Sequence, residues 1–567
     1  MKRLRPYLKG YLKESILGPL FKLLEALFEL LVPLLIANMI DISISQHNSQ
    51  GILRVVLTLF GLATIGLLLS VTAQYFSSKA AVGFTRQMTD DLFKKIMFLS
   101  KEDQDHLGYA SLLSRLTSDS FQIQTGINQF LRLFLRAPII VCGAMVMAYW
   151  ISPSLTLWFV MMVIVLLTLV FVMSHLLGPL YLLIRRETDH LVRLTSQQLQ
   201  GIRVIKAFNQ TQKELQAFKQ QNMLLSRHQY QAATLANVLN PMTFLVVNLT
   251  LLILIWQGSW QVAHRSLSQG MLVALINYLL QILAELLKMT MLMGTINQSV
   301  TAAKRINQVF VLADEAPLPL LKDGPISTHL LTIRHLTFTY PGAAEPSLYD
   351  IQLSADQGEW IGIIGGTGAG KSTLINLLMR FYELDAGSIK LDKVPIKCYA
   401  KEELRSITGM VLQETWLKDA TVHELIAYGS EEASRGEVVA AAKAAHAHFF
   451  IMQLPKTYDT YLSASDDALS QGQLQLLAIA RMFLKKPKVL ILDEATSSID
   501  IRTEAVIQEA LKELMRGRTS FIIAHRLSTI QSADLILVMD QGRLVEWGTH
   551  ASLMSKNGCY ARLQKIE

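Results

Sequence analysis

The chain has 567 residues, of which 51% are apolar and 17% charged, and its formal net charge is +8 at pH 7. This length is too great for one hydrophobic core and excludes a single-domain protein. Three cysteines, Cys142, Cys398 and Cys559, lie far apart without a CxxC pair, which argues against a disulfide framework or a zinc site. Because no basic run interleaved with aromatic residues is present, we attribute the positive charge to membrane flanks and expect no nucleic-acid partner.

Six long apolar stretches predict six membrane-spanning helices in the first part of the chain. They cover residues 15–42, 54–82, 128–151, 155–184, 238–262 and 268–296. Residues 1–9 are basic, and no small-residue cleavage site follows the first apolar stretch, so we expect a retained anchor and not a signal peptide. Residues 1–312 are therefore predicted to form an α-helical membrane domain.

Basic residues are distributed unevenly between the connections. The short connections at 43–50 and 152–154 contain no Lys or Arg, and the one around His264 contains only Arg265. The long connections, 83–127 and 185–237, carry many basic residues, so the positive-inside rule predicts that they and both termini are cytoplasmic. Both are rich in helix-forming residues, and we expect helical extensions of the spans with turns near 105–119 and 201–208.

Ionisable residues also occur inside or at the ends of the predicted spans, where charge is costly and usually faces protein or a water-filled cavity. They are Lys22, Glu25, Glu29, Glu285 and Lys288. Lys22 and Glu25 are three residues apart, as are Glu285 and Lys288, so each pair can interact on one helix face. Two interpretations stay open: structural pairs near the inner membrane surface, or a polar patch in a substrate cavity.

A change in composition marks the end of the membrane domain. Residues 313–330 contain three prolines and several charges, which is typical of a linker. After it, Leu336, Phe338 and Tyr340 alternate as in a strand that ends at Pro341 and Gly342. Residues 331–567 are predicted to form an α/β domain.

Residues 365–372, Gly-Gly-Thr-Gly-Ala-Gly-Lys-Ser, fit the phosphate-loop pattern G-x-x-x-x-G-K-[ST]. The apolar run 360–364 before it predicts a strand, and residues 373–380 have helical spacing. An accidental glycine-rich turn is the alternative, and these flanks disfavour it. The order predicts an α/β P-loop domain in which Lys371 reaches the β- and γ-phosphates and the Ser372 hydroxyl ligates Mg²⁺.

Two further apolar runs end in residues suited to phosphoryl transfer. Residues 489–492 predict a central strand, followed by Asp493, which is placed to support Mg²⁺, and Glu494, which can polarise an attacking water. Residues 520–524 predict another strand, followed by His525, which can meet the γ-phosphate at the carboxyl edge of the sheet. Together these residues predict hydrolysis of a nucleotide.

Four additional motifs complete a familiar set, and the chain resembles an ATP-binding-cassette (ABC) exporter half-transporter of the multidrug or lipid type over essentially its whole length. Gln413 is similar to the family's Q-loop, residues 469–473 (Leu-Ser-Gln-Gly-Gln) to its signature, 497–500 to its D-loop and 524–526 to its H-loop. Tyr340 occupies the position at which the family stacks an aromatic ring on adenine. The implied architecture is the type IV exporter fold, six transmembrane helices followed by a nucleotide-binding domain.

The resemblance implies ATP and Mg²⁺ as cofactors and a head-to-tail pair of nucleotide-binding domains. The implied catalytic residues are Glu494 as general base, His525 and Gln413, and the implied Mg²⁺ ligands are Ser372, Gln413 and Asp493. The implied ATP-binding residues are Tyr340, Gly365, Thr367, Gly368, Gly370, Lys371, Ser372 and Thr373. The signature residues implied to reach the partner's nucleotide are Ser470, Gln471, Gly472 and Gln473. The tips near Gly108 and Gly201 resemble coupling helices that dock onto the nucleotide-binding domains.

Three departures from the family pattern concern what this chain donates to its partner. Gln471 stands where glycine is common, Leu474 stands where arginine is usual, and residues 463–466 replace a Gly-Glu-x-Gly segment. This asymmetry resembles one subunit of a heterodimeric bacterial exporter with one degenerate ATP site, so we favour a heterodimer over a homodimer. A neutral variation at position 471 is the alternative.

The resemblance implies ATP-driven export of an amphipathic or hydrophobic small molecule across the cytoplasmic membrane by alternating access. Exporters of a specific lipid, peptide or thiol compound share the same motifs, and the fold also supports ATP-gated channels and regulators. The expected partners are a second half-transporter, membrane lipid and a small-molecule substrate. The expected location is the cell membrane, multi-pass, with the nucleotide-binding domain and both termini cytoplasmic.

Overall fold

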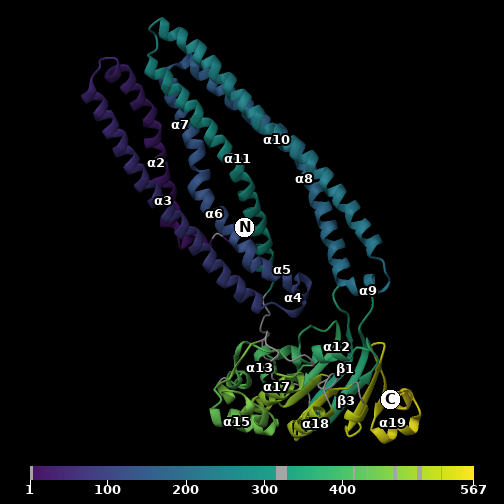
Figure 1. The fold of residues 1–567 in the computed structure, drawn as a ribbon. Helices are drawn as coiled ribbons and strands as arrows, with labels where there is room; N and C mark the ends of the chain where they lie inside the picture. Colours follow the sequence, from purple (N-terminus) through teal and green to yellow (C-terminus); the bar gives the residue numbers. More distant parts are fainter. Residues whose placement is uncertain are drawn as a thin grey trace. The chain divides into compact units, whose positions relative to one another are not determined.

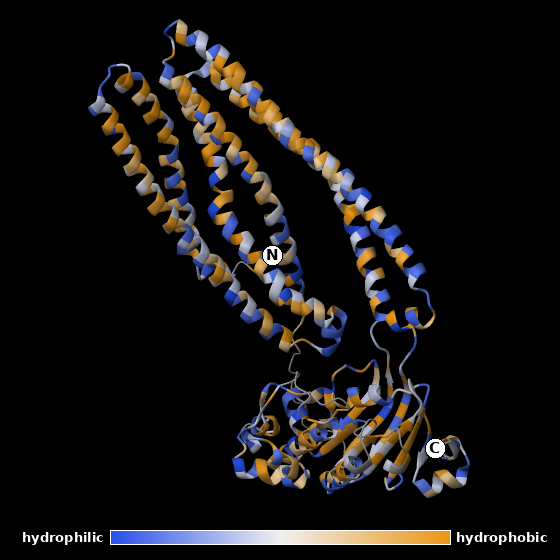
Figure 2. Ribbon diagram, in the orientation of Figure 1, coloured by the Kyte–Doolittle hydropathy of each residue, from blue (hydrophilic) through white to orange (hydrophobic). Residues whose placement is uncertain are grey.

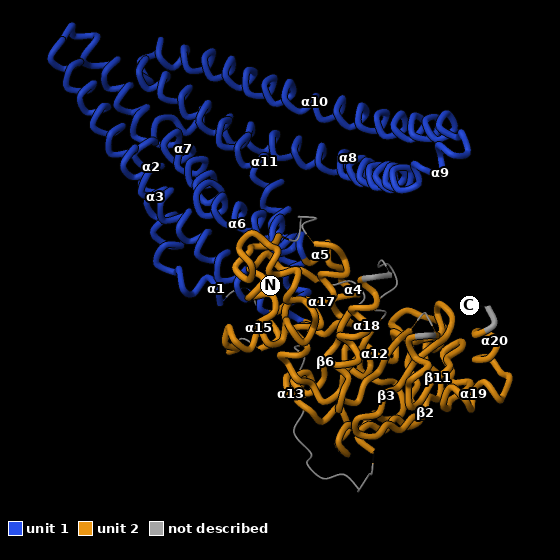
Figure 3. Tube along the Cα trace, turned by 60° about the horizontal axis from the view of Figure 1, so that its bottom comes forward, with its two compact units in different colours: residues 1–94, 113–311 blue, residues 95–112, 312–567 orange. Residues whose placement is uncertain are grey.

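The computed structural model describes Leu4 and residues 6–313, 329–412, 416–430, 432–463, 469–493, 501–524 and 527–566. The chain forms two compact units, residues 1–94 with 113–311 and residues 95–112 with 312–567 (Figure 3). The predicted linker 313–330 lies largely outside the described residues, and the boundaries at 312 and 331 stay predictions.

The described residues from Pro6 to Val311 form helices joined by short turns (Figure 1). Its α-helices are α1 Pro6–Lys9, α2 Leu12–Asn38, α3 Ser49–Met97, α4 Lys101–Leu107, α5 Tyr109–Ser114, α6 Ser120–Gln129, α7 Arg136–Ile151, α8 Pro153–Gln200, α9 Ile202–Ala207, α10 Thr211–Ala263 and α11 Gln269–Val311. Three π-helical segments interrupt this pattern, η2 Met39–Ile44, η3 Arg115–Asp119 and η4 Phe130–Phe134.

Six helical stretches in the described part of the chain are long and apolar enough to cross a membrane, which confirms the predicted number of spans. They are Leu12–Ile44, Ser49–Met97, Tyr109–Ile151, Pro153–Gln200, Thr211–Ala263 and Gln269–Val311. Most greatly exceed the ~20 residues that the apolar layer requires. The long connections are therefore helical extensions of the spans, as predicted, and α8 and α10 run side by side to the short helix α9 (Figure 1). Figure 2 shows polar residues becoming frequent as these two helices approach α9.

The membrane unit has its own apolar core between α2, α7, α8, α10 and α11. Leu30, Ile140, Phe159 and Tyr278 are among its fully buried members. The Tyr278 hydroxyl donates to the Leu30 carbonyl at 2.7 Å, so the one polar atom of this large ring is satisfied inside the core. This packing holds α2, α7 and α11 together.

The second unit contains the strands β1 Leu331–Phe338, β2 Leu348–Ala355, β3 Trp360–Gly365, β4 Ala386–Leu391, β5 Val394–Pro395, β6 Thr408–Val411, β7 Ala420–Thr421, β8 Tyr461–Leu462, β9 Val489–Asp493, β10 Thr519–Ile523, β11 Leu535–Asp540 and β12 Arg543–Gly548. Its helices after residue 312 are α12 Lys371–Leu378, α13 Lys401–Ile407, α14 Val422–Ala427, α15 Arg435–Ala444, α16 His448–Gln453, α17 Gln471–Lys485, α18 Ile501–Met515, α19 His550–Lys556 and α20 Cys559–Ile566. Short 3₁₀ turns occupy η5 Ile396–Cys398, η6 Thr457–Asp459 and η7 Leu527–Thr529.

A six-stranded sheet organises this unit, in the order β12-β11-β3-β10-β9-β6. All neighbours are parallel except β11 and β12, so the predicted strands at 360–364, 489–492 and 520–524 are confirmed as interior parallel strands. Ile491 and Phe521 are fully buried, as expected for strands covered on both faces. Because Ile523 pairs with both Ile363 and Asp493, the three predicted strands end at one edge of the sheet.

One predicted helix ends early. Residues 373–380 were expected to be helical, but α12 stops at Leu378 and Arg380 takes a positive φ of 51°. The Arg380 side chain is buried and donates to the Tyr399 carbonyl at 3.0 Å. This contact, together with a 3.0 Å bond from Nε to Glu383, favours the left-handed turn over another helical residue.

Candidate functional site: a nucleotide pocket

A cavity of about 970 Å³ lies at the carboxyl edge of the six-stranded sheet, beside the phosphate loop. It is lined by Glu345, Pro346, Ser347, Tyr349, Thr367, Gly368, Ala369, Gly370, Lys371, Ser372, Thr373, Asp493, Ile523, Gln541, Gly542 and Arg543. Six of the predicted ATP-binding residues and the predicted Mg²⁺ ligand Asp493 therefore meet in one place. A concave pocket at the ends of parallel strands is where α/β proteins bind ligands.

The glycines of the phosphate loop fall into two groups. Gly365 and Gly370 are packed: a Cβ on Gly365 would lie 2.2 Å from the Met539 carbonyl oxygen, and one on Gly370 would lie 2.7 Å from the Leu348 side chain. Gly370 also has φ +96° and caps α12. Gly366 and Gly368 have no atom of the described chain within 4 Å of a Cβ position. Two glycines thus fit the loop against the sheet, and two leave open space for a phosphate chain.

We expect Gly370→Ala to lower the free energy of unfolding of the nucleotide-free protein by about 1–3 kcal/mol, because alanine disfavours this φ and its methyl group would clash. Thermal unfolding of the full chain measures this effect. Gly366→Ala is the control, since it adds the same methyl group in open space. Equal unfolding temperatures for the two variants would contradict the packing argument.

Lys371, the first residue of α12, is buried at 6% exposure and folded back onto the loop. Its Nζ donates to the Gly365 carbonyl at 2.8 Å and to the Gly366 carbonyl at 3.1 Å. Burial lowers the pKa of the Lys371 ammonium, and the Asp493 carboxylate opposes this shift. The loop carbonyls hold this cation beside the cavity, from which phosphate oxygens could attract it.

Tyr340 lies beside the cavity and not among its lining residues. Its hydroxyl donates to Thr373 Oγ1 at 3.4 Å, and its ring packs edge-on against Phe338 at 5.0 Å and Tyr382 at 5.2 Å. These contacts restrict the orientation of the Tyr340 ring. Its predicted stacking on adenine stays a prediction.

The signature residues lie at the start of α17 and do not line the cavity. Ser470 Oγ accepts from the Gln473 backbone N–H, and the Gln473 side chain accepts from the Ser470 N–H at 2.9 Å, which together form a capping box. Gln471 is exposed and Gly472 is buried. The capping box thus fixes the backbone at the positive end of this helix.

Three predicted functional residues, Gln413, Glu494 and His525, lie outside the described residues, as do residues 464–466 and 497–500. Glu494 and His525 nevertheless follow described strands in the sequence, since β9 ends at Asp493 and Ala524 directly follows β10. Their predicted roles stay predictions.

Comparison with known proteins identifies the family. A family profile described as "ABC transporter transmembrane region" matches residues 15–286, and one described as "ABC transporter" matches residues 348–497. A fatty acid ABC transporter ATP-binding/permease protein of Mycobacterium tuberculosis is 37% identical over 455 residues, 80% of this chain and 72% of that protein. The chain belongs to the ABC transporter family.

Other relatives are similar over the full length. The ATP-dependent lipid A-core flippase of Chromobacterium violaceum is 32% identical over 100% of this chain and 97% of its own. The uncharacterized ABC transporter ATP-binding protein YfiB of Bacillus subtilis is 31% identical over 100% of this chain and 98% of its own. The chain is thus an ABC exporter half-transporter, a multi-pass membrane protein with the membrane domain ahead of the nucleotide-binding domain. Its activity is that of an ATPase coupled to transport, and exporters of this family function as dimers.

The ABC transporter pocket also contains residues that sequence reasoning missed. The turn between β11 and β12 is joined to the phosphate loop, because the Gly542 N–H donates to the Ala369 carbonyl at 3.2 Å and the Gly542 carbonyl accepts from Tyr349 N–H at 2.8 Å. The Arg543 guanidinium lies 4.1 Å over the Tyr349 ring. The Gln541-Gly542 pair between two strand-like runs signals a hairpin. Nothing in that local pattern, however, indicates that the hairpin meets a loop about 170 residues earlier.

The first predicted coupling tip belongs to the same compact unit as the nucleotide-binding domain. Ser100 caps α4, and the Tyr382 hydroxyl donates to the Asp105 carboxylate on that helix. Burial, and then the Asp105 carboxylate, raise the pKa of the Tyr382 hydroxyl. The Lys95 ammonium donates to the Leu312 carbonyl at 2.6 Å. The docking role that the resemblance implied for this tip stays a prediction.

Proposed function

We propose that this chain is one half of a dimeric exporter that uses ATP hydrolysis to move an amphipathic or hydrophobic small molecule outward across the cytoplasmic membrane by alternating access. The observation that carries the proposal is the convergence of Lys371, Ser372 and Asp493 on one cavity, in a chain that also has six helices long enough to span a membrane. Nucleotide hydrolysis and a membrane passage in one chain are the two requirements of an ATP-driven pump.

The pocket supports binding of ATP with Mg²⁺. The cavity of about 970 Å³ has an open loop backbone at Gly368, and its Ser372 hydroxyl and Asp493 carboxylate are oxygen ligands of the kind that Mg²⁺ prefers. We assign Ser372, Asp493 and Gln413 to the metal, which would neutralise charge on the transferred phosphoryl group. Lys371 would bind the phosphates, Glu494 would polarise the attacking water, and His525 would contact the γ-phosphate.

We propose that the nucleotide-binding domain and both termini are cytoplasmic. The support is the distribution of charge: the short connections 43–50 and 152–154 have no Lys or Arg, whereas the long helical connections are basic. Cytoplasmic ATP would then reach the pocket directly. Because ATP would bind on the cytoplasmic side and substrate would leave that side, the transporter would be an exporter.

The proposed substrate class rests partly on relatives. Two of them are named for molecules that join a polar group to apolar chains, a fatty acid and lipid A-core. Extrusion of such amphiphiles needs a path that accepts both parts. We extend this class, and not either compound, to the present chain.

We propose a heterodimer, in which this chain supplies an altered signature to the partner's ATP site. Gln471 is exposed at the start of α17, where the family commonly has glycine. The added side chain stands at the helix end that would approach the partner's γ-phosphate. This chain's own phosphate loop, with Lys371 and Ser372, has the full pattern, so the two sites of the dimer would differ.

The test is reconstitution into proteoliposomes, with the chain alone and with the product of a neighbouring transporter gene. We expect ATP-dependent movement of fluorescent amphiphiles against their gradient, and full activity only for the co-expressed pair. A stable, fully active dimer of this chain alone would overturn the heterodimer. Flux that runs only down the gradient, without ATP turnover, would overturn the exporter and favour an ATP-gated channel.

A further inference from the structure

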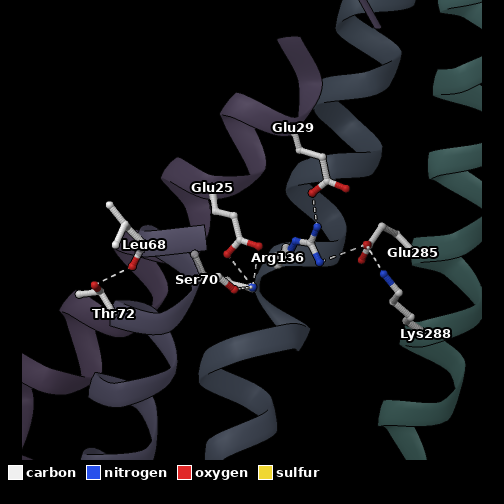
Figure 4. A network of polar contacts seen from close by, with 9 residues as sticks. Glu25, Glu29, Leu68, Ser70, Thr72, Arg136, Glu285 and Lys288 are labelled. Carbon is white, nitrogen blue, oxygen red and sulfur yellow. Dashed lines mark hydrogen bonds and ion pairs between the residues drawn. The ribbon is translucent and has the colours of Figure 1, made fainter. Parts of the chain in front are cut away.

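A chain of charged side chains crosses three helices inside the membrane unit (Figure 4). Arg136 of α7 lies between two carboxylates, Glu29 of α2, with which it makes an ion pair, and Glu285 of α11, at 3.5 Å. Glu285 also pairs with Lys288, 2.9 Å away on the same helix. The sequence had predicted the Glu285–Lys288 pair but had not singled out Arg136. The four residues alternate in charge and sum to zero.

These charges share one level in the membrane. Glu29, Arg136 and Glu285 each lie about 15 residues from the end of their span at the short connections, or roughly 22 Å at 1.5 Å per residue. This places them inside an apolar layer ~30 Å thick, toward the side of the long connections. Arg136 and Glu285 are 9% and 4% exposed. Charges buried at this depth are costly and mark pathways more often than they stabilise a fold.

A second ion pair nearby provides a contrast. Lys22 donates to both Glu25 oxygens, at 2.8 and 2.6 Å, and to Ser70 Oγ at 3.0 Å, so its three donor positions are used. This pair is a closed structural contact. In the network of ion pairs around Arg136, by contrast, the buried Nε of Arg136 has no hydrogen-bond partner among the described residues. The π-helical segment η4 and a turn at Leu135 directly precede it. Irregular backbone inside a span is tolerated where it is buried in protein or lines a water-filled cavity.

The accessible ends of the network have opposite charge. The Glu29 side chain is 39% exposed and the Lys288 side chain 53% exposed, whereas Arg136 and Glu285 between them are buried. A purely anionic group would be attracted by the Lys288 ammonium but repelled by the Glu29 carboxylate. A purely cationic group would be attracted by Glu29 but repelled by Lys288. Met291, three residues after Lys288 on the same face of α11, is 80% exposed and offers an adaptable apolar contact.

We propose that Glu29, Arg136, Glu285 and Lys288 form a binding site for an amphiphile with a zwitterionic headgroup. The anionic part of the headgroup binds Lys288, the cationic part binds Glu29, and the apolar chains extend along the methionines of α11, while the buried Arg136 and Glu285 connect the two ends. The further step, that this bound amphiphile is the exported substrate, rests on the proposed function. The site itself binds without ATP.

The experiment measures binding of fluorescent lipids with equal acyl chains to the purified full-length transporter without nucleotide. The probes are a short-chain phosphatidylethanolamine (zwitterionic), the matching phosphatidylglycerol (anionic) and a matching trimethylammonium lipid (cationic). We expect the zwitterionic lipid to bind at least about tenfold more tightly than either of the others. Equal binding of the three lipids would overturn the proposal.

Two variants at the exposed ends test the assignment without leaving Arg136 unpaired. Glu29→Gln should shift the preference toward the anionic lipid, and Lys288→Gln toward the cationic lipid, while Lys288→Arg should restore the original preference. Glu14→Gln is the control, because Glu14 is on the same helix in a separate pair with Lys79 at 3.1 Å. An unchanged preference in both variants overturns the site, as does an anionic preference that depends on Lys288 alone.

Transport measurements separate this inference from the function on which it rests. ATP-driven export in proteoliposomes with no headgroup preference would refute the site and leave the exporter intact. Selective binding of the zwitterionic lipid with no ATP-driven movement of any probe would refute the exporter and leave the binding site intact.

Discussion

Replacement of Glu494 by Gln is expected to preserve ATP binding and to lower the rate of ATP hydrolysis by about 100-fold or more. Asp493, the last residue of β9, lines the nucleotide cavity at the edge where Ile523 and the phosphate loop also meet, and Glu494 is the next residue in the sequence. A carboxylate there can accept a proton from an attacking water. An amide of the same shape cannot, while contacts to the bound nucleotide are kept.

The measurement pairs steady-state hydrolysis with equilibrium binding of a fluorescent ATP analogue. The Kd of the variant should stay within about threefold of the parent value while turnover falls. Glu513→Gln is the control, since Glu513 is an exposed carboxylate on α18 that pairs with Arg516 at 3.4 Å. Hydrolysis at the parent rate in Glu494→Gln would remove the general-base assignment.

Local pattern was sufficient for much of the fold. The spans were predicted because about 20 apolar residues in sequence have few other environments, and the phosphate loop because its spacing, strand and helix are contiguous. The Glu285–Lys288 pair followed from helical geometry alone, since residues three apart share a face. In each case the evidence lies within one stretch of chain.

Contacts between distant stretches could not be predicted in the same way. Arg136 lies inside a predicted span, but its ion pairs to Glu29 and Glu285 depend on how three helices pack. The Arg543 side chain reaches the pocket because β11 pairs with β3, which brings the turn after β11 beside the phosphate loop. The early end of α12 has the same origin, since Arg380 bonds to Tyr399 on a separate segment. Periodicity gives the face of an element and not its partner.

Removal of the phosphate-loop ammonium by Lys371→Ala is expected to raise the Kd for ATP by roughly 10- to 100-fold, or about 1.4–2.8 kcal/mol. In the described structure Nζ donates to the carbonyls of Gly365 and Gly366, at 2.8 and 3.1 Å, and its pKa is lowered chiefly by burial. Phosphate oxygens would compete with these carbonyls for the ammonium. Because the side chain is already ordered, little side-chain entropy is lost when ATP binds.

Nucleotide titration of the purified protein, followed by fluorescence, measures this change. Lys488→Ala is the matched control: Lys488 belongs to the same unit, but its side chain is 64% exposed and lies 3.9 Å from Asp392. Thermal unfolding without nucleotide distinguishes lost affinity from lost structure, because alanine leaves the loop carbonyls beside an open cavity in which water can replace the ammonium. An unchanged Kd in a folded Lys371→Ala protein would mean that the backbone N–H groups at the start of α12 hold the phosphates without the lysine.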